Sequence, residues 1–334
     1  MTPSTNDTNV STEKQFEQFC SLLTTMPNIA SLLHTLLTDR HYPYAQRHDF
    51  MTLLKQLPYF IEQISQYPFE HYRFSPSIDA FITALKQCGL PLNHSHLNKL
   101  CVAPYKCWQF STHSTYLMDL LSTFQSALQS PEFKVTRIAQ QKEAQRNCEE
   151  LAQYIDKLFS DYAKLLVIRI DLSYHKHLDV SLETLESDLK RFHSNKRHHS
   201  LLIQILGYIT KIEYGIDKKL HVHALFLFNG NHYRQDIKIA QYIGEYWVNT
   251  IAAKDTGIYW NCNHNKEKYV KLGIGAIQHN DEEKRNNLIE AIHYLCKKTT
   301  QVIKPIDAPM TKLLRKGQYT PSDTQKLGRP RRGE

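Results

Sequence analysis

The apolar run Leu220-His221-Val222-His223-Ala224-Leu225-Phe226-Leu227-Phe228 decides the fold that we expect for this chain. A second β-rich run, residues 201–214, precedes it, and residues 215–219 join the two runs in a hairpin-like connection. Successive side chains of a strand point to opposite faces of the sheet, so His221 and His223 share one face. The residues that alternate with them point into a core on the other face. The sequence therefore predicts a hairpin that holds two imidazoles side by side.

A carboxylate stands close to these histidines in the same predicted hairpin. Glu213 lies on the first strand, and its side chain could reach an ion held by His221 and His223. Two nitrogens and one carboxylate suit Mn²⁺ or Mg²⁺, although many transition ions would also bind. The alternative is a chance pattern, because a chain with 18 histidines can contain such a pair without a metal.

The segments around the hairpin mix strand and helix patterns. Strand-like runs cover residues 165–172, 258–262 and 270–277, and helical periodicity covers residues 182–193, 237–250 and 281–300. Elements in this order predict an α+β fold, with a central antiparallel sheet flanked by helices, over residues 162–305.

The last of these helices presents a tyrosine away from its apolar side. Its apolar stripe consists of Leu288, Ile289, Ile292, Leu295 and Cys296. Tyr294 lies about 160° around the helix from Ile292, and Lys298 follows one turn later. A core tyrosine would lie on the stripe, so the hydroxyl of Tyr294 is presented either to solvent, as an ordinary exposed tyrosine, or to a substrate.

The rest of the chain divides into four regions. Residues 1–12 are polar and expected to be disordered, and residues 13–131 form a mainly α-helical N-terminal domain of unknown role. A connecting helix is expected over residues 132–161, and residues 306–334 form a basic, flexible tail. From Gln301 to Glu334 there are eight Lys and Arg against three Asp and Glu, and the whole chain has a formal net charge of +8. Charge of this sign fits contact with a phosphate backbone.

Composition argues against several classes of protein. No run of apolar residues is long enough to span a membrane, and the polar N-terminus is unlike a secretory signal, so we expect a cytoplasmic protein. The seven cysteines are scattered without a CxxC pair, which indicates neither a disulfide framework nor a cysteine zinc site.

Taken together, these motifs resemble those of the HUH endonucleases, and specifically the rolling-circle replication initiators. Members of that superfamily have a first apolar strand, then His-hydrophobic-His on a strand, then a helix with Tyr-x-x-x-Lys. The matching elements here are the 165–172 strand, the His221–His223 pair, and Tyr294 with Lys298. Many such initiators carry a glutamate before the histidines, and Glu213 matches it.

Two segments carry a narrower resemblance. Residues 167–172 and 293–297 are similar to the Gp2-type replication proteins of filamentous phages and their prophage-encoded relatives. The resemblance covers about residues 160–305 and implies an HUH/Rep-like, RRM-like nuclease domain. It implies metal-dependent nicking and rejoining of single-stranded DNA at a replication origin, in the cytoplasm of a bacterial host. No P-loop motif is present, so the resemblance also implies a host helicase and polymerase as partners.

The resemblance assigns a role to each candidate residue. Glu213, His221 and His223 would hold the metal, and Tyr294 would attack the scissile phosphate and become joined to it. Lys298, or the neighbouring Lys297, would assist the tyrosine or steady the phosphate charge. Elsewhere in the chain, Lys190, Arg191, Lys196 and Arg197 could grip the phosphate backbone, although a solvated charged helix face is the alternative. Tyr259 and Trp260 could stack bases, with core packing as the alternative.

Arg169 and Asp171 share one face of the first strand of this domain. They would support the active site or touch DNA, or they pair with each other.

Three other functions compete with this hypothesis. A non-catalytic DNA-binding regulator derived from such an initiator would keep the fold, although the intact set of motif residues argues against it. An HUH relaxase or transposase would use the same nicking chemistry. A metal oxygenase with an HxH motif on a β-barrel would need many short strands, and this domain has long helices between its strands instead.

Overall fold

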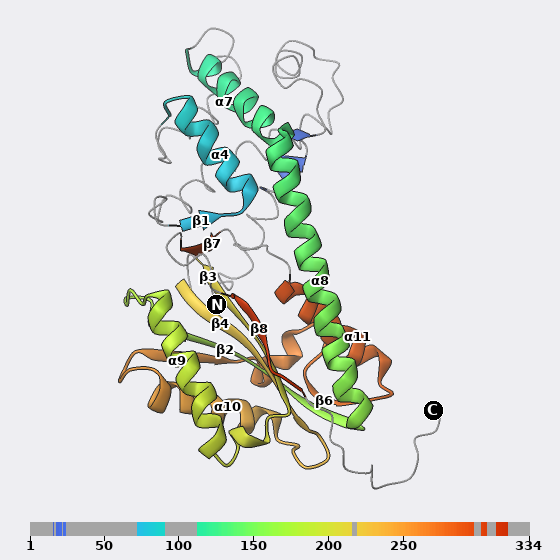
Figure 1. Cartoon of the computed structure of the whole chain (residues 1–334). Helices are drawn as coiled ribbons and strands as arrows, with labels where there is room; N and C mark the ends of the chain where they lie inside the picture. The colour runs from blue at the N-terminus through green and yellow to red at the C-terminus, as the bar shows by residue number, and fades with distance from the viewer. Residues whose placement is uncertain are drawn as a thin grey trace. The chain divides into compact units, whose positions relative to one another are not determined.

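The structure is a computed structural model, shown in Figure 1, and the chain divides into two units. The described residues are 16, 18–21, 23–24, 72–90, 112–215, 219–296, 302–305 and 312–319. The first unit comprises Met1–Lys142, Gly215–Asp217 and Lys298–Pro309, and the second comprises Glu143–Tyr214, Lys218–Lys297 and Met310–Glu334.

The first unit contains helices and one short strand pair. Helix α4 (Pro76–Gln87) packs against α7 (Thr112–Gln129), and β1 (Tyr72–Phe74) pairs antiparallel with β7 (Val302–Pro305). Three phenylalanine rings form the centre of its core: Phe16, Phe81 and Phe124, with ring centroids between 4.9 and 6.2 Å apart. The β1–β7 pair was not expected from the sequence, because each strand is short and its partner lies far away along the chain.

The second unit is built around an antiparallel sheet. Its strands are β2 (Lys164–Tyr174), β3 (Gly207–Gly215), β4 (Lys219–Asn229), β5 (Gly257–Asn261), β6 (Gly275–Gln278) and β8 (Leu314–Lys316). Neighbouring strands follow the order β3-β4-β2-β5, with β6 also pairing with β2 and β8 pairing with β3. The helices that pack on this sheet are the part of α8 (Pro131–Asp161) from Glu143 onward, α9 (Leu182–Asn195), α10 (Asp236–Tyr246) and α11 (Glu282–Cys296). The α+β class with an antiparallel sheet flanked by helices is therefore confirmed.

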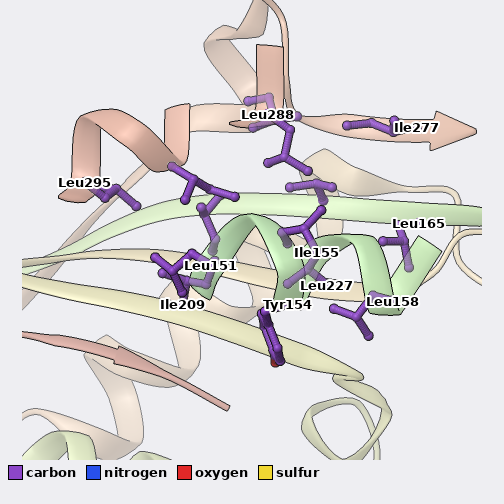
Figure 2. Packing of buried hydrophobic residues seen from close by; sticks show 14 of the residues in the cluster. Leu151, Tyr154, Ile155, Leu158, Leu165, Ile209, Leu227, Ile277, Leu288 and Leu295 are labelled. Carbon is purple, nitrogen blue, oxygen red and sulfur yellow. The ribbon is translucent and has the colours of Figure 1, made fainter. Parts of the chain in front are cut away.

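Helices α8 and α11 cover one face of this sheet. Figure 2 shows this core, in which buried residues of α8 and α11 meet alternate residues of β2, β3 and β4. Its members include Leu151, Ile155 and Leu158 from α8, Leu288 and Leu295 from α11, and Leu165, Ile209 and Leu227 from the strands. The C-terminal part of α8 and α11 therefore belong to the same layer.

The residues that alternate with these strand positions face α9 and α10. Phe226 of β4 stacks on Phe192 of α9, with ring centroids 5.6 Å apart. Tyr174 of β2 donates a hydrogen bond of 2.7 Å to Asp188 of α9. A Cβ atom placed on Gly244 of α10 would lie 2.2 Å from the ring of Tyr259, so α10 and β5 approach closely. Both faces of the sheet are thus covered by helices.

Some elements differ in extent from the sequence expectation. Strand β8 lies within the segment expected to be a flexible tail and pairs with β3, and its neighbour Tyr319 donates a hydrogen bond to Asp161. A three-residue strand is too short to show a period in the sequence. The helix expected over residues 281–300 is described from Glu282 to Cys296, and residues 297–300 lie outside the described part.

Within the described ranges, no helix has the length and apolar character needed to cross a membrane.

Candidate metal centre and nucleophile

Strands β3 and β4 bring Glu213, His221 and His223 together, and we call this group the triad. Nε2 of His223 lies 3.2 Å and Nε2 of His221 lies 3.8 Å from the same oxygen of Glu213, Oε2. One ligand atom from each residue lies within 4.8 Å of the others. Both histidines are buried, with exposed fractions of 6% and 8%. The geometry fits three ligands around one divalent cation, although it does not select a particular metal.

Hydrogen bonds at the other ring nitrogens orient both imidazoles. Nδ1 of His223 lies 2.6 Å from Oδ1 of Asp171, and Nδ1 of His221 lies 2.9 Å from the carbonyl oxygen of Lys219. Ionised carboxylates and carbonyls accept hydrogen bonds only, so in both rings Nδ1 carries the proton. Metal-binding histidines are commonly held in this way, by a carboxylate or carbonyl behind the ring. Both Nε2 atoms are thereby directed towards Glu213.

Charges within the triad favour one positive charge at its centre. Burial opposes charge on His223, but the carboxylates of Asp171 and Glu213 outweigh burial and raise its pKa to about 9. Burial, followed by repulsion from His223, lowers the pKa of His221 to about 4. Burial would raise the pKa of Glu213, but the two histidines outweigh it and lower that pKa. A buried site that stabilises positive charge with two carboxylates suits a bound cation.

The register between β2 and β4 places Asp171 directly opposite His223. Residues opposite each other in an antiparallel pair point to the same face of the sheet. Asp171 therefore supports the triad from the next strand. The sequence left open whether Asp171 supports the active site, touches DNA or pairs with Arg169. The contact with His223 favours support of the site.

Arg169 lies on the same face of β2, two residues before Asp171. Its guanidinium carbon lies 5.9 Å from the centre of the Tyr269 ring. Burial acts to lower the pKa of Arg169, but Asp171, followed by Cys262, Tyr269 and Tyr294, outweighs burial and raises it. Arg169 therefore keeps its positive charge.

Helix α11 presents Tyr294 as the sequence pattern predicts. The side chain is 44% exposed, whereas Leu288, Ile292 and Leu295 of the same helix are buried in the core under α8 and α11. Helix α11 packs on the face of the sheet that carries the triad, since its buried residues share one core with Val167 of β2 and Leu225 of β4. The two lysines expected to assist it, Lys297 and Lys298, lie outside the described residues.

The sequence analysis did not identify Asn263, whose side chain completes the hydrogen bonding along one side of β2. Strand β5 pairs with residues 170–174 of β2 and β6 with residues 164–167, which leaves a gap between them. The Asn263 side chain fills this gap, accepting a hydrogen bond of 2.8 Å from the Arg169 amide and donating one of 3.1 Å to the Val167 carbonyl. Its amide also donates 3.1 Å to Asp236. No signal in the sequence marks this role, since the main partners are backbone groups of a distant strand.

The basic residues considered as grips for a phosphate backbone lie around the end of α9. Lys190 and Arg197 are exposed, whereas Lys196 donates a hydrogen bond of 2.8 Å to the Ile205 carbonyl. Arg191 forms an ion pair of 2.8 Å with Asp188. Two of these four residues, Arg191 and Lys196, therefore interact with groups of the protein itself.

Residues 128–307 match a family model described as the YagK/YfjJ C-terminal domain. This range contains the triad, Asp171, Arg169 and Tyr294. No curated protein and no solved structure matches the chain.

Proposed function

The chain belongs to the YagK/YfjJ C-terminal domain family, and we propose that it nicks and rejoins single-stranded DNA as an HUH-type replication initiator. In this proposal, the second unit is an HUH/Rep-like, RRM-like nuclease domain. Its substrate is single-stranded DNA at the origin of a phage, prophage or plasmid, and the product primes rolling-circle replication in the bacterial cytoplasm. Host helicase and polymerase would complete the process.

The observation that carries the proposal is the orientation of the triad. Both Nε2 atoms converge on one oxygen of Glu213 while both Nδ1 atoms are held from behind. Any buried imidazole needs partners for its ring nitrogens. The feature that points to a metal is that both Nε2 atoms share one carboxylate oxygen. A bound Mg²⁺ or Mn²⁺ would supply Lewis acidity to a phosphate at this point.

Tyr294 is the proposed nucleophile. Its oxygen attacks the scissile phosphorus in line, forming a bond to it, while the bond from phosphorus to the 3′ oxygen breaks. The phenol loses one proton and the 3′ oxygen gains one, which yields a 5′-phosphotyrosine and a free 3′ hydroxyl. The phosphodiester energy is retained for rejoining. Two observations support this role: Tyr294 is exposed, and its helix packs on the face of the sheet that carries the triad.

Arg169 is the described cation best placed to help this step. A phenol holds its proton at neutral pH, so a nearby positive charge favours attack by its oxygen. Arg169 lies on the face of β2 that α11, the helix of Tyr294, covers, and on the strand that supports His223. It would stabilise the developing phenolate or the phosphate, a role that the family resemblance assigned to Lys298 or Lys297.

The first experiment tests covalent attachment. Purified full-length protein is incubated with Mn²⁺ and single-stranded circles, random oligonucleotides and DNA from the encoding element's intergenic regions. We expect a slower-migrating protein–DNA band after SDS treatment that requires the metal. Tyr294→Phe should abolish the band, whereas Tyr242→Phe, an exposed tyrosine of α10, should retain it.

The outcomes separate the competing functions. A metal-dependent band that survives in Tyr294→Phe would remove Tyr294 from the role of nucleophile. Binding to DNA without a band on any substrate would favour the non-catalytic regulator. A relaxase or transposase would give the same band, and replication assays on the encoding element would distinguish it from an initiator.

A further inference from the structure

We propose that Trp260 is a stacking platform for a base of single-stranded DNA next to the triad. The proposal rests on the nicking function proposed above and adds a binding position for the substrate. It follows from the register of three neighbouring strands, from the direction of the Trp260 side chain, and from its exposure.

The strand register places Trp260 in one row with the triad. Asp171 of β2 is paired with His223 of β4 on one side and with Trp260 of β5 on the other. Paired residues in antiparallel strands point to the same face, so all three side chains stand on the face that carries the triad. Neighbouring strands are about 4.8 Å apart, which places Trp260 about 10 Å from His223 across the sheet. A base next to a phosphate at the triad can reach this position.

The residue before Trp260 points the other way. Tyr259 is paired with Leu172 and packs against Gly244 of α10, on the opposite face of the sheet. Of the two aromatic residues considered for base stacking, Tyr259 therefore serves packing. Trp260 alone of these two faces the triad.

The indole of Trp260 is available to a ligand. It is 52% exposed, and its side chain makes no hydrogen bond or ring contact with any residue that the structure describes. In the strand order of the described sheet, β5 is an end strand, so Trp260 stands at the edge of the sheet. A single exposed aromatic residue needs no explanation by itself. Trp260 is distinguished by its alignment with Asp171 and His223.

The chemistry of the surroundings favours a nucleotide. A nucleobase offers an apolar π-face to the indole, while its phosphate is attracted to positive charge. The positively charged Arg169 lies on the same face of β2, two residues before Asp171. Asp171 is the residue with which Trp260 is paired. The chain as a whole has a net charge of +8. Stacking of this kind tolerates any base, so the site predicts affinity without sequence preference.

The experiment measures binding separately from nicking. Fluorescence anisotropy with a labelled oligo-dT and Mn²⁺ is recorded in the Tyr294→Phe background, where no covalent product is expected. Trp260→Ala should weaken binding about tenfold, and Trp260→Phe should weaken it less, because a smaller ring still stacks. Tyr242→Ala serves as the matched control, since Tyr242 is 46% exposed on α10, and it should bind as well as the parent protein.

An abasic oligonucleotide of the same length shows whether the contact is made to a base. The parent protein should bind oligo-dT more tightly than the abasic strand, and Trp260→Ala should reduce that ratio about tenfold. If Mn²⁺ raises the Tm of Trp260→Ala as much as that of the parent protein, the triad of this variant is intact.

Two results would overturn the proposal. If Trp260→Ala binds oligo-dT as tightly as the parent protein, Trp260 does not stack a base, while a covalent band from the wild type would leave the nicking function standing. If the parent protein binds no single-stranded DNA and the wild type forms no band, both proposals fail together.

Discussion

Oδ1 of Asp171 accepts a hydrogen bond of 2.6 Å from Nδ1 of His223 across two paired strands. The contact is buried and determines which nitrogen of His223 can face a ligand. Asp171 is therefore a positioning residue, one step behind the triad. Its influence on a metal would pass through the orientation and basicity of the imidazole.

Replacing Asp171 tests this arrangement directly. Asp171→Asn keeps the size of the side chain but removes its negative charge and allows His223 to adopt the other tautomer. We expect the affinity for Mn²⁺ to fall about 10- to 100-fold, measured by isothermal titration calorimetry. Asp179→Asn, an exposed carboxylate in the loop after β2, should leave the affinity unchanged. Equal affinities for the two variants would show that Asp171 does not act on the metal site.

Metal binding should stabilise the folded chain. A ligand that binds only the native state adds about 2.7 kcal/mol at a concentration one hundred times its Kd, so Mn²⁺ should raise the Tm and a chelator should reverse the change. His221→Ala and His223→Ala should each abolish most of this rise in differential scanning calorimetry. His232→Ala, an exposed histidine near the end of β4, should retain it. A full rise in both triad variants would place the metal elsewhere.

Asn263 should contribute strongly to stability. Asn263→Leu leaves the Arg169 amide and the Val167 carbonyl without their partner, in a position where Asn263 is fully buried. Unsatisfied buried groups cost 1–3 kcal/mol each, so we expect a loss of about 3 kcal/mol in the free energy of unfolding by urea. Asn265→Ala removes one longer bond of 3.3 Å to Asn261 and should cost less than about 1 kcal/mol. Similar losses in both variants would contradict the role assigned to Asn263.

His193 should make the fold sensitive to acid. Burial, followed by the positive charges of Lys196 and Arg315, lowers the pKa of His193 from 6.5 to about 4. The unfolded chain therefore binds this proton first as the pH falls, and the native state loses stability between pH 6.5 and about pH 4. The slope from this group should be about 1 kcal/mol per pH unit, allowing for its partial exposure.

A variant isolates this contribution from those of the other histidines. His193→Phe keeps a ring to stack on Tyr208, whose centroid lies 4.4 Å away, but cannot titrate. Its unfolding free energy should fall less steeply than that of the wild type over the same pH range. His198→Phe, at an exposed position, should follow the wild-type slope. Parallel slopes for wild type and His193→Phe would exclude His193 as a source of the acid sensitivity.

Local periodicity alone predicted the parts of the site that lie within one element or one hairpin. The alternation of a strand placed His221 and His223 on one face, and the 3.6-residue period of a helix placed Tyr294 off the apolar stripe. Glu213 could be added because a hairpin brings its two strands together. The α+β class followed from the same patterns, since each long element carries its own periodic signal.

The tertiary structure alone decided the contacts between distant segments. Asp171 meets His223, and Trp260 aligns with both, because packing on the two faces of the sheet sets the register of β4, β2 and β5. The role of Asn263 can be recognised only when the gap between the strands paired with β2 is known. Strand β8 can likewise be recognised only from its pairing with β3. Strand register depends on which residues are buried together, and that information is not contained in the local period of any single strand.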